Sequence, residues 1–426
     1  HPAKSLSDPE AFPHFDAPEF KLNDIDAILL THAHADHSGL IPYLYKMGYE
    51  GPTYTTAPTR DVTALICLDT ISIAQKEGRD PLYSATDIKN MVKHTICLDY
   101  EEVTDITPDV RLTFYNAGHT LGSAMAHLHI GNGQHNLLYT SDMNYETSNL
   151  LAAAATKFPR LETVITEATL GSKDDVQKSR KEAEDDFLKE INDVIANKGK
   201  VLLPVLGTGR AQEVMVILEK AMKEKLIPDI PIYVQGMVWD ITAIHTTYPD
   251  FFNSKVKRDV FHKDQNPFLS PIFKNITSQK EQQEVIESGE PCIIMATSGM
   301  LVGGASVEYF KHLSENPKNV LIFTCYQAEG SLGRILQNGM KEINMGSAEK
   351  PDMVIVRCKI ATISGFSGHS SRNQLMNFFK NLDPKPKKII IQHGESSKCL
   401  DLASSLHKLL KVETAAPKNL ESIRIK

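Results

Sequence analysis

The stretch THAHADHSG, which begins at Thr31, places three histidines and one aspartate within six residues, directly after the apolar run AILL. This pattern predicts a short strand that ends in a tight loop. Alternate residues of extended backbone point to the same side, so His32 and His34 can share a metal ion while Asp36 and His37 reach a second. Neutral imidazoles suit zinc, and carboxylates complete such sites. The alternative is a solvated surface loop.

Further metal ligands are expected where other strands end beside small residues. His119 follows RLTFY and lies between glycines in NAGHTLGS, Asp142 follows NLLYT, and His393 follows KKIIIQ. Glycine permits a close approach of the backbone to a metal ion, and a carboxylate at Asp142 could bridge two cations. Each residue taken alone is more often structural, but together they predict one site.

The length of 426 residues exceeds one ordinary core and predicts two or three units. The apolar runs VLLPVLGTG, PIYVQG, PCIIMATSG and NVLIFTCYQ alternate with helical patterns, which is typical of buried strands in a parallel, doubly wound sheet. After them, VIVRCKIATISG and KKIIIQHG return to strands that end in histidines, as the first third does. We therefore expect an α/β chain in which a domain of residues 176–360 interrupts another made of residues 1–175 and 361–426.

Composition narrows the class of protein. The formal net charge of −7 argues against a broad basic surface for nucleic acid, so any such contact must be local. No apolar run is long enough to cross a bilayer and no signal peptide is recognised, so we expect a cytoplasmic protein without a membrane partner. The six widely spaced cysteines fit reduced thiols in that compartment.

Taken in order, HAHADH, the histidine of GHTLGS and the aspartate of YTSDM resemble the metal motifs of the metallo-β-lactamase superfamily. Later motifs resemble those of its β-CASP branch of nucleic-acid-processing nucleases, namely Glu167 in EATLG, His369 in GFSGHSS and His393 in QHGE. The resemblance covers nearly the whole chain and looks closest to the archaeal homologues of the cleavage and polyadenylation specificity factor. It implies a metallo-β-lactamase αββα sandwich, interrupted by a β-CASP domain that closes over the metal face.

The resemblance also implies two zinc ions per chain. One zinc ion would bind His32, His34 and His119, and the other would bind Asp36, His37 and His393. Asp142 would be a bridging and catalytic ligand. Members of this branch whose last motif is a histidine, as His393 is here, act on RNA, so the resemblance favours RNA over DNA as the substrate. The C-terminal PKNLESIRIK resembles the dimerising tail of the archaeal proteins and implies a homodimer.

Two features of that branch are not found. Nothing in residues 1–31 matches the expected Asp-x-Gly motif of an earlier strand, and no G-x-x-G loop of the KH type precedes the metal motif. The chain also begins with His1 and a Pro-rich lead-in. We therefore expect that the N-terminus is trimmed, and that the first strands and the KH domains lie outside this sequence.

Two further groups of residues are assigned to catalysis and substrate binding. His369 is the expected general acid for a leaving 3′ oxygen, kept protonated by Glu167. Phosphate contacts are expected from strand–helix junctions of the inserted domain. The residues concerned are Ser298, Gly299, Arg210 and Arg334. The alternatives are a structural role for the histidine and ordinary ion pairs for the arginines.

These features together predict a metal-dependent ribonuclease that hydrolyses phosphodiester bonds of single-stranded RNA. We expect an endonuclease in RNA 3′-end processing or transcription termination, with the corresponding machinery as partner; the sequence leaves open whether the chain also acts as a 5′-to-3′ exonuclease. A non-catalytic scaffold subunit and a small-molecule metallo-hydrolase are the alternatives. The filled ligand positions argue against the first, and the long insertion with its Glu167 and His369 pair argues against the second.

Overall fold

The computed structural model describes residues 12–346 and 352–425. They form two compact units, one inserted into the other along the chain. The inserted unit holds residues 177–250 and 255–367, and the interrupted unit holds residues 12–176, 251–254 and 368–425. The expected boundary near 175 lies beside the first crossing. The expected boundary near 360 falls inside strand β16 (Lys359–Thr362), which pairs within the inserted unit.

The interrupted unit contains two sheets. The small one is parallel, with the order β1-β2-β3, and the large one has the order β18-β17-β8-β7-β6-β5-β4. In the large sheet, β4 to β7 pair antiparallel, whereas β7, β8, β17 and β18 pair in parallel. The strands are β1 (Ile28–Leu29), β2 (Thr53–Thr55), β3 (Thr95–Cys97), β4 (Val103–Thr107), β5 (Val110–Asn116), β6 (Ala124–Ile130), β7 (His135–Tyr139), β8 (Thr163–Glu167), β17 (Lys388–Gln392) and β18 (Glu413–Ala415).

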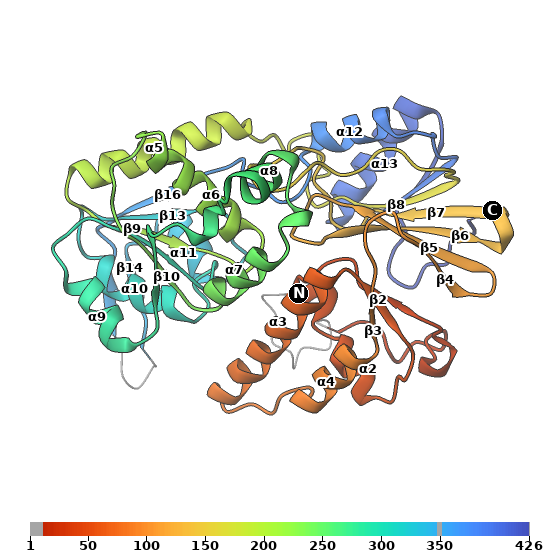
Figure 1. Cartoon of the computed structure of the whole chain (residues 1–426), viewed down its shortest axis with the longest axis horizontal. Coiled ribbons are helices and arrows are strands. Elements are labelled where there is room, and N and C mark those ends of the chain that lie inside the picture. Colours follow the sequence, from red (N-terminus) through yellow and green to blue (C-terminus); the bar gives the residue numbers. More distant parts are fainter. Residues whose placement is uncertain (1–11, 347–351, 426) are drawn as a thin grey trace. The chain divides into compact units, whose positions relative to one another are not determined.

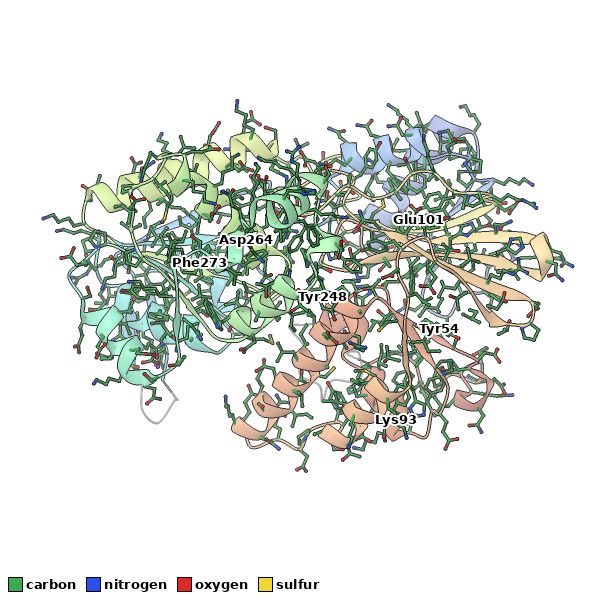
Figure 2. The ribbon with its side chains drawn as sticks, in the orientation of Figure 1. Tyr54, Lys93, Glu101, Tyr248, Asp264 and Phe273 are labelled. Carbon is green, nitrogen blue, oxygen red and sulfur yellow. The ribbon has the colours of Figure 1, made fainter. Side chains whose placement is uncertain are left out.

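Helices cover the outer faces of this pair of sheets (Figure 1). On the small sheet, Tyr45, Ile88 and Met91 pack around Leu30. Between the sheets, Tyr54 of β2 (Figure 2) belongs to one cluster with residues of β5 and β6. The layers are therefore helix, sheet, sheet, helix. The helices are α1 (Ala35–Ser38), α2 (Ile41–Lys46), α3 (Ala57–Lys76), α4 (Ala85–Lys93), α12 (Arg372–Asn381) and α13 (Ser396–Leu410).

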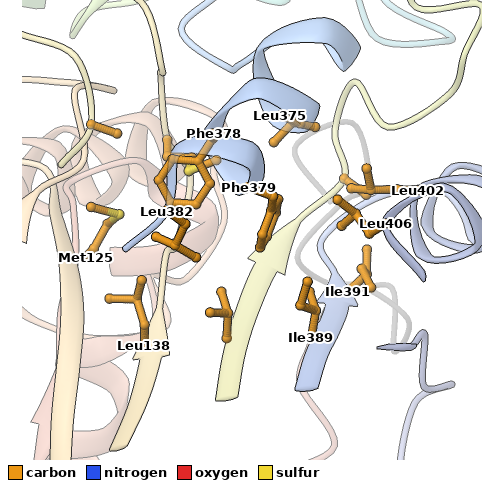
Figure 3. Packing of buried hydrophobic residues seen from close by; sticks show 14 of the residues in the cluster. Met125, Leu138, Leu375, Phe378, Phe379, Leu382, Ile389, Ile391, Leu402 and Leu406 are labelled. Carbon is orange, nitrogen blue, oxygen red and sulfur yellow. The ribbon is translucent and has the colours of Figure 1, made fainter. Parts of the chain in front are cut away.

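The hydrophobic core on the outer face of the large sheet fixes the strands whose ends carry the clustered histidines. Phe378 and Phe379 of α12 and Leu402 of α13 are fully buried with Ile389 and Ile391 of β17 (Figure 3). Loss of one such aromatic ring would leave a cavity, which costs about 3–5 kcal/mol. Strand β17 therefore ends at a well-defined point.

The inserted unit is built on a six-stranded parallel sheet with the order β11-β10-β12-β9-β13-β16. Tyr309 and Phe310 of α10 pack on it with Leu202 and Leu321. Because all its strands are parallel, their carboxyl ends meet at one edge, where ligands bind in such sheets. The strands are β9 (Val201–Pro204), β10 (Ile232–Gln235), β11 (Phe273–Ile276), β12 (Ile293–Ala296) and β13 (Val320–Phe323), with β16 and a separate hairpin of β14 (Glu342–Asn344) and β15 (Met353–Ile355).

The remaining helices complete the chain. The α-helices are α5 (Arg180–Ala196), α6 (Arg210–Lys223), α7 (Met237–Thr247), α8 (Ser254–Lys263), α9 (Gln279–Glu287), α10 (Ala305–Leu313) and α11 (Leu332–Gln337). Short 3-10 helices are η2 (Leu22–Asp24), η3 (Gly131–Gly133), η4 (Pro249–Phe251) and η5 (Pro267–Leu269). Across residues 12–346 and 352–425, no helix combines the length and the apolar character needed to span a membrane.

Candidate metal centre

Three histidines and one aspartate meet at strand ends of the interrupted unit. His32, His34, His119 and Asp142 each offer one ligand-type atom, and these atoms lie within 4.8 Å of one another. His34 Nδ1 is 3.0 Å from His119 Nε2, and His32 Nε2 is 3.6 Å from Asp142 Oδ2. His32, His119 and Asp142 are buried. The three histidines of this group are called site 1.

Local backbone explains how the chain delivers these side chains. The chain leaves β1 in an extended conformation, with His34 at φ −58° and ψ 144°, before helix α1 begins. Extended backbone brings His32 and His34 to the same side, and the helical turn that follows carries Asp36 onward. Gly118, which precedes His119, has φ +70°, and a Cβ there would lie 2.7 Å from two carbonyl oxygens. Only glycine fits this approach.

A second group adjoins the first. Ligand-type atoms of Asp36, His37 and His393 also lie within 4.8 Å of one another, and this group is called site 2. Asp142 contacts both sites, because its Oδ2 lies 3.3 Å from His37 Nε2 and its Oδ1 lies 3.2 Å from His393 Nδ1. The structure thus brings together all seven predicted ligands in the grouping expected from the sequence.

The donor atoms of these residues suit bound cations. Within the described residues, His32 Nε2, His37 Nε2 and Asp142 Oδ1 are buried without a hydrogen-bond partner. Such burial costs about 1–3 kcal/mol for each atom. His119 Nδ1 lies 2.8 Å from the carbonyl oxygen of Gly368 and donates to it, which leaves the Nε2 lone pair facing site 1. A set of imidazole nitrogens and carboxylate oxygens fits a divalent cation such as zinc.

Protonation differs between the two sites. Burial and the neighbouring histidines hold the pKa values of His32 and His119 well below 6.5, and burial lowers that of His34 to about 4. Burial also acts to lower the pKa of His393, but a hydrogen bond to Asp36 and the charge of Asp142 outweigh it and raise that pKa to about 9. At pH 7 without metal, the site 1 imidazoles are therefore neutral, whereas His393 is an imidazolium.

A third group, beside Asp142, pairs the carboxylate of Glu167 with the imidazole of His369. His369 Nδ1 lies 2.9 Å from Glu167 Oε2, and the other Glu167 oxygen accepts a hydrogen bond from the Met143 amide at 2.8 Å. Burial acts to lower the pKa of His369, but the charge of Glu167 and its hydrogen bond outweigh this and raise it. A histidine held in this way is suited to donate a proton.

Sequence reasoning missed several groups that orient the ligands. The hydroxyls of Thr31 and Ser141 are 2.7 Å apart, and each lies 3.5 Å from His32 Nδ1. Ser141 has φ +53°, which is rare for a residue with a side chain. The sequence holds one indication of these two residues, which is that each directly precedes a predicted ligand. The Gly368 carbonyl gave no signal, since its contact with His119 joins residues 249 positions apart.

The inserted unit holds the predicted phosphate-binding residues. Arg210 is only 7% exposed, and its Nη1 donates to the carbonyl oxygens of Phe366 at 2.9 Å and Ser367 at 3.4 Å. These contacts indicate that Arg210 anchors the chain segment that directly precedes His369. They favour this structural role over the phosphate contact expected from the sequence.

Of the other three residues, Ser298 and Gly299 lie in the loop after β12, and Arg334 lies in helix α11. The Ser298 hydroxyl donates to the Gly303 carbonyl oxygen and accepts from the Val302 amide, so the loop itself engages it. The carbonyl oxygen of Gly299 accepts from the Gln327 side chain. A phosphate contact at this loop remains a prediction. Arg334 has no carboxylate within ion-pair distance among residues 12–346 and 352–425, which argues against the ion-pair alternative.

Comparison with known proteins agrees with the fold and the site. Family models match residues 9–170 as a metallo-beta-lactamase superfamily domain, residues 211–336 as a Beta-Casp domain, and residues 353–417 as a Zn-dependent metallo-hydrolase RNA specificity domain. Layers of helix, sheet, sheet and helix with a histidine-rich edge are the architecture of the metallo-β-lactamase fold. The chain belongs to the β-CASP branch of the metallo-β-lactamase family, and the predicted fold class is confirmed.

The chain is similar to archaeal proteins named transcription termination factor FttA. It is 51% identical to that of Methanocaldococcus jannaschii over 418 residues, 98% of this chain and 66% of that protein. It is 50% identical to that of Thermococcus kodakarensis over 429 residues, 99% of this chain and 66% of that protein. For Lokiarchaeum the identity is 46% over 418 residues, 98% of this chain and 66% of that protein. The chain thus spans 66% of the length of these relatives.

Zinc binding should release protons at pH 7. Binding at site 2 requires a neutral His393, whose pKa of about 9 keeps it protonated in the metal-free chain, whereas the site 1 imidazoles are already neutral. Calorimetric titration in buffers of different ionisation enthalpy should therefore show about one proton released at site 2 that His393→Gln abolishes. Zinc binding with the same proton release in both proteins would contradict the assignment.

Proposed function

We propose that this chain is a zinc-dependent ribonuclease that hydrolyses single-stranded RNA during transcription termination or RNA 3′-end formation. The observation that carries the proposal is the presence, in one unit, of sites 1 and 2 together with the Glu167–His369 pair. The name of the relatives and the RNA specificity domain support RNA as the substrate. Because the relatives are longer, the activity, substrates and partners of the whole protein belong to this proposal.

The residues of the site would take the following roles. Site 1 (His32, His34 and His119) would hold one zinc ion, site 2 (Asp36, His37 and His393) a second, and Asp142 would contact both. Bound zinc would supply Lewis acidity toward the phosphodiester and neutralise charge in the transition state. Asp142 is 2% exposed, so its carboxylate would hold its place without competition from bulk water.

Proton delivery would fall to His369. Its Nδ1 hydrogen is directed to Glu167, so Nε2 is the atom that would pass a proton to the leaving 3′ oxygen. Glu167 would position the ring and favour its protonated form. The buried Met143 amide in turn fixes the Glu167 carboxylate, which leaves the pair little freedom to turn.

Cleavage of a 5′-labelled single-stranded RNA is the first test. The zinc-loaded chain should cut it, and Asp142→Asn should not, because this change removes the charge shared by sites 1 and 2. Asp105→Asn is a matched control, because the Asp105 side chain is 75% exposed and forms a surface ion pair with Arg111. Mapping of the product ends would separate internal cuts from stepwise removal of nucleotides at the 5′ end.

Other outcomes of this assay would favour the alternatives. A chain that binds zinc but cuts no RNA would support a non-catalytic scaffold and contradict the proposal. Hydrolysis of a thioester or a lactam without cleavage of RNA would support a small-molecule metallo-hydrolase.

The acid role predicts a defect in turnover without loss of metal. His369→Ala should lower kcat roughly 100- to 10,000-fold, as loss of a general acid does. Its zinc content, measured by atomic absorption, should equal that of the unmodified chain. The matched control is His312→Ala, which removes an exposed histidine paired with Glu308 at 3.1 Å. Loss of zinc in His369→Ala would show that the histidine supports the metal sites instead.

We also propose a cytoplasmic homodimer that pairs through the C-terminal tail. The described tail residues 417–425 are largely exposed, and Leu420 is 68% exposed, as expected for a segment that awaits a partner. All six cysteines are unpaired, which supports a reducing compartment. Light scattering should give a mass about twice that of one chain, and removal of residues 417–426 should halve it. A monomer that persists at high concentration would contradict the dimer.

A further inference from the structure

Tyr326 is an exposed aromatic side chain at the carboxyl edge of the inserted unit's parallel sheet. It follows strand β13 by three residues and is 69% exposed. An isolated exposed apolar residue needs no explanation. Tyr326 differs because the guanidinium of Arg334 lies over its ring, 5.7 Å from the ring centroid. The pair combines an aromatic face with a planar cation.

Arg334 carries its charge without a carboxylate partner among the residues that the structure describes. None of the acidic residues in the described part of the chain lies within ion-pair distance of it, in contrast to Arg180, which pairs with buried Glu213 at 3.0 Å. Its backbone amide is bonded to the Ser331 hydroxyl at 3.2 Å, which fixes the start of helix α11. Arg334 is therefore held in place and still able to meet an anion.

The backbone around the pair is tied into a fixed platform. The Gly333 amide of helix α11 donates to the Met300 carbonyl oxygen at 3.2 Å, which joins the start of this helix to the loop after β12. The buried Gln327 side chain donates to the carbonyl oxygens of Gly299 and Cys325, at 3.0 and 3.2 Å. The loop that carries Tyr326 is thus tied to the loop after β12 through Gln327, the residue that follows the ring, so the ring presents its face without a large ordering cost.

We propose that Tyr326 and Arg334 form a subsite for one nucleobase of single-stranded RNA, with the base stacked on the ring and the adjoining phosphate near the guanidinium. Stacking on aromatic rings and on guanidinium planes is how proteins hold unpaired bases, and it requires no base-specific hydrogen bonds. The subsite would bind any base. The inference rests on the proposed function, since it assumes RNA as the substrate.

Charge and chemistry favour RNA over a protein at this position. A peptide anchor would call for an apolar pocket around the ring, whereas the neighbour of Tyr326 is a planar cation that has no carboxylate partner in the described chain. An unpaired base with its phosphate matches both groups at once. The chain is acidic overall, so local groups of this kind would have to supply the contacts.

Equilibrium binding to two oligonucleotides of equal length tests the subsite. One is oligouridine, and the other has the same sugar–phosphate backbone without bases. In a His369→Ala variant of the 426-residue chain, which slows cleavage, added Tyr326→Ala should weaken oligouridine binding about tenfold and leave abasic binding unchanged. Tyr326→Phe keeps the ring and should bind as the parent does. Arg334→Gln should weaken both oligonucleotides, because it removes a phosphate contact.

A second measurement keeps the residue unmodified. RNA that contains 5-iodouridine should crosslink under ultraviolet light to the peptide that carries Tyr326, identified by mass spectrometry. If Tyr326→Ala binds oligouridine as tightly as the parent while the unmodified chain still cuts RNA, the subsite is wrong and the proposed function stands. In that case the exposed Tyr326 ring would be a contact for a protein partner instead of RNA. If the unmodified chain binds no RNA, both the subsite and the proposed function are overturned.

Discussion

The interrupted unit depends on one constraint, which is that nitrogen and oxygen atoms are buried together without enough protein partners. His32, His37 and Asp142 each leave a buried atom unbonded within the described chain. Packing elsewhere must hold these groups in place, because they would otherwise separate into water. The core of α12 and α13 on β17 supplies that packing, so apolar side chains fix the position of polar ones (Figure 3).

Asp142 links the parts of the site to one another. Its carboxylate contacts histidines of sites 1 and 2, and it also belongs to a group with Glu167 and His369. A change in charge at this one residue would therefore reach the metal ligands and the proton donor together. The cluster behaves as one electrostatic unit rather than as separate ligand sets.

The sequence was most informative where the chemistry is local. Spacing within HAHADH was enough to group four candidate ligands, and the rule that ligands follow strands added His119, Asp142 and His393, all of which the structure brings together. Local patterns could not reveal that the carbonyl oxygens of Phe366 and Ser367 take up the Arg210 guanidinium, because this contact depends on residues more than 150 positions away. Tyr326 was missed for a related reason, since its significance lies in the side chain of Arg334 and not in its own neighbours.

The position of the insertion along the chain has a consequence for protein synthesis. All members of site 1 precede residue 143, whereas His369 and His393 follow the inserted unit, which ends at Ser367. A nascent chain on the ribosome therefore contains all of site 1 more than two hundred residues before His369 has been made. In the mechanism proposed above, site 1 could take up metal early, whereas a chain that is still being translated would lack its general acid and would not cut the messenger or ribosomal RNA around it.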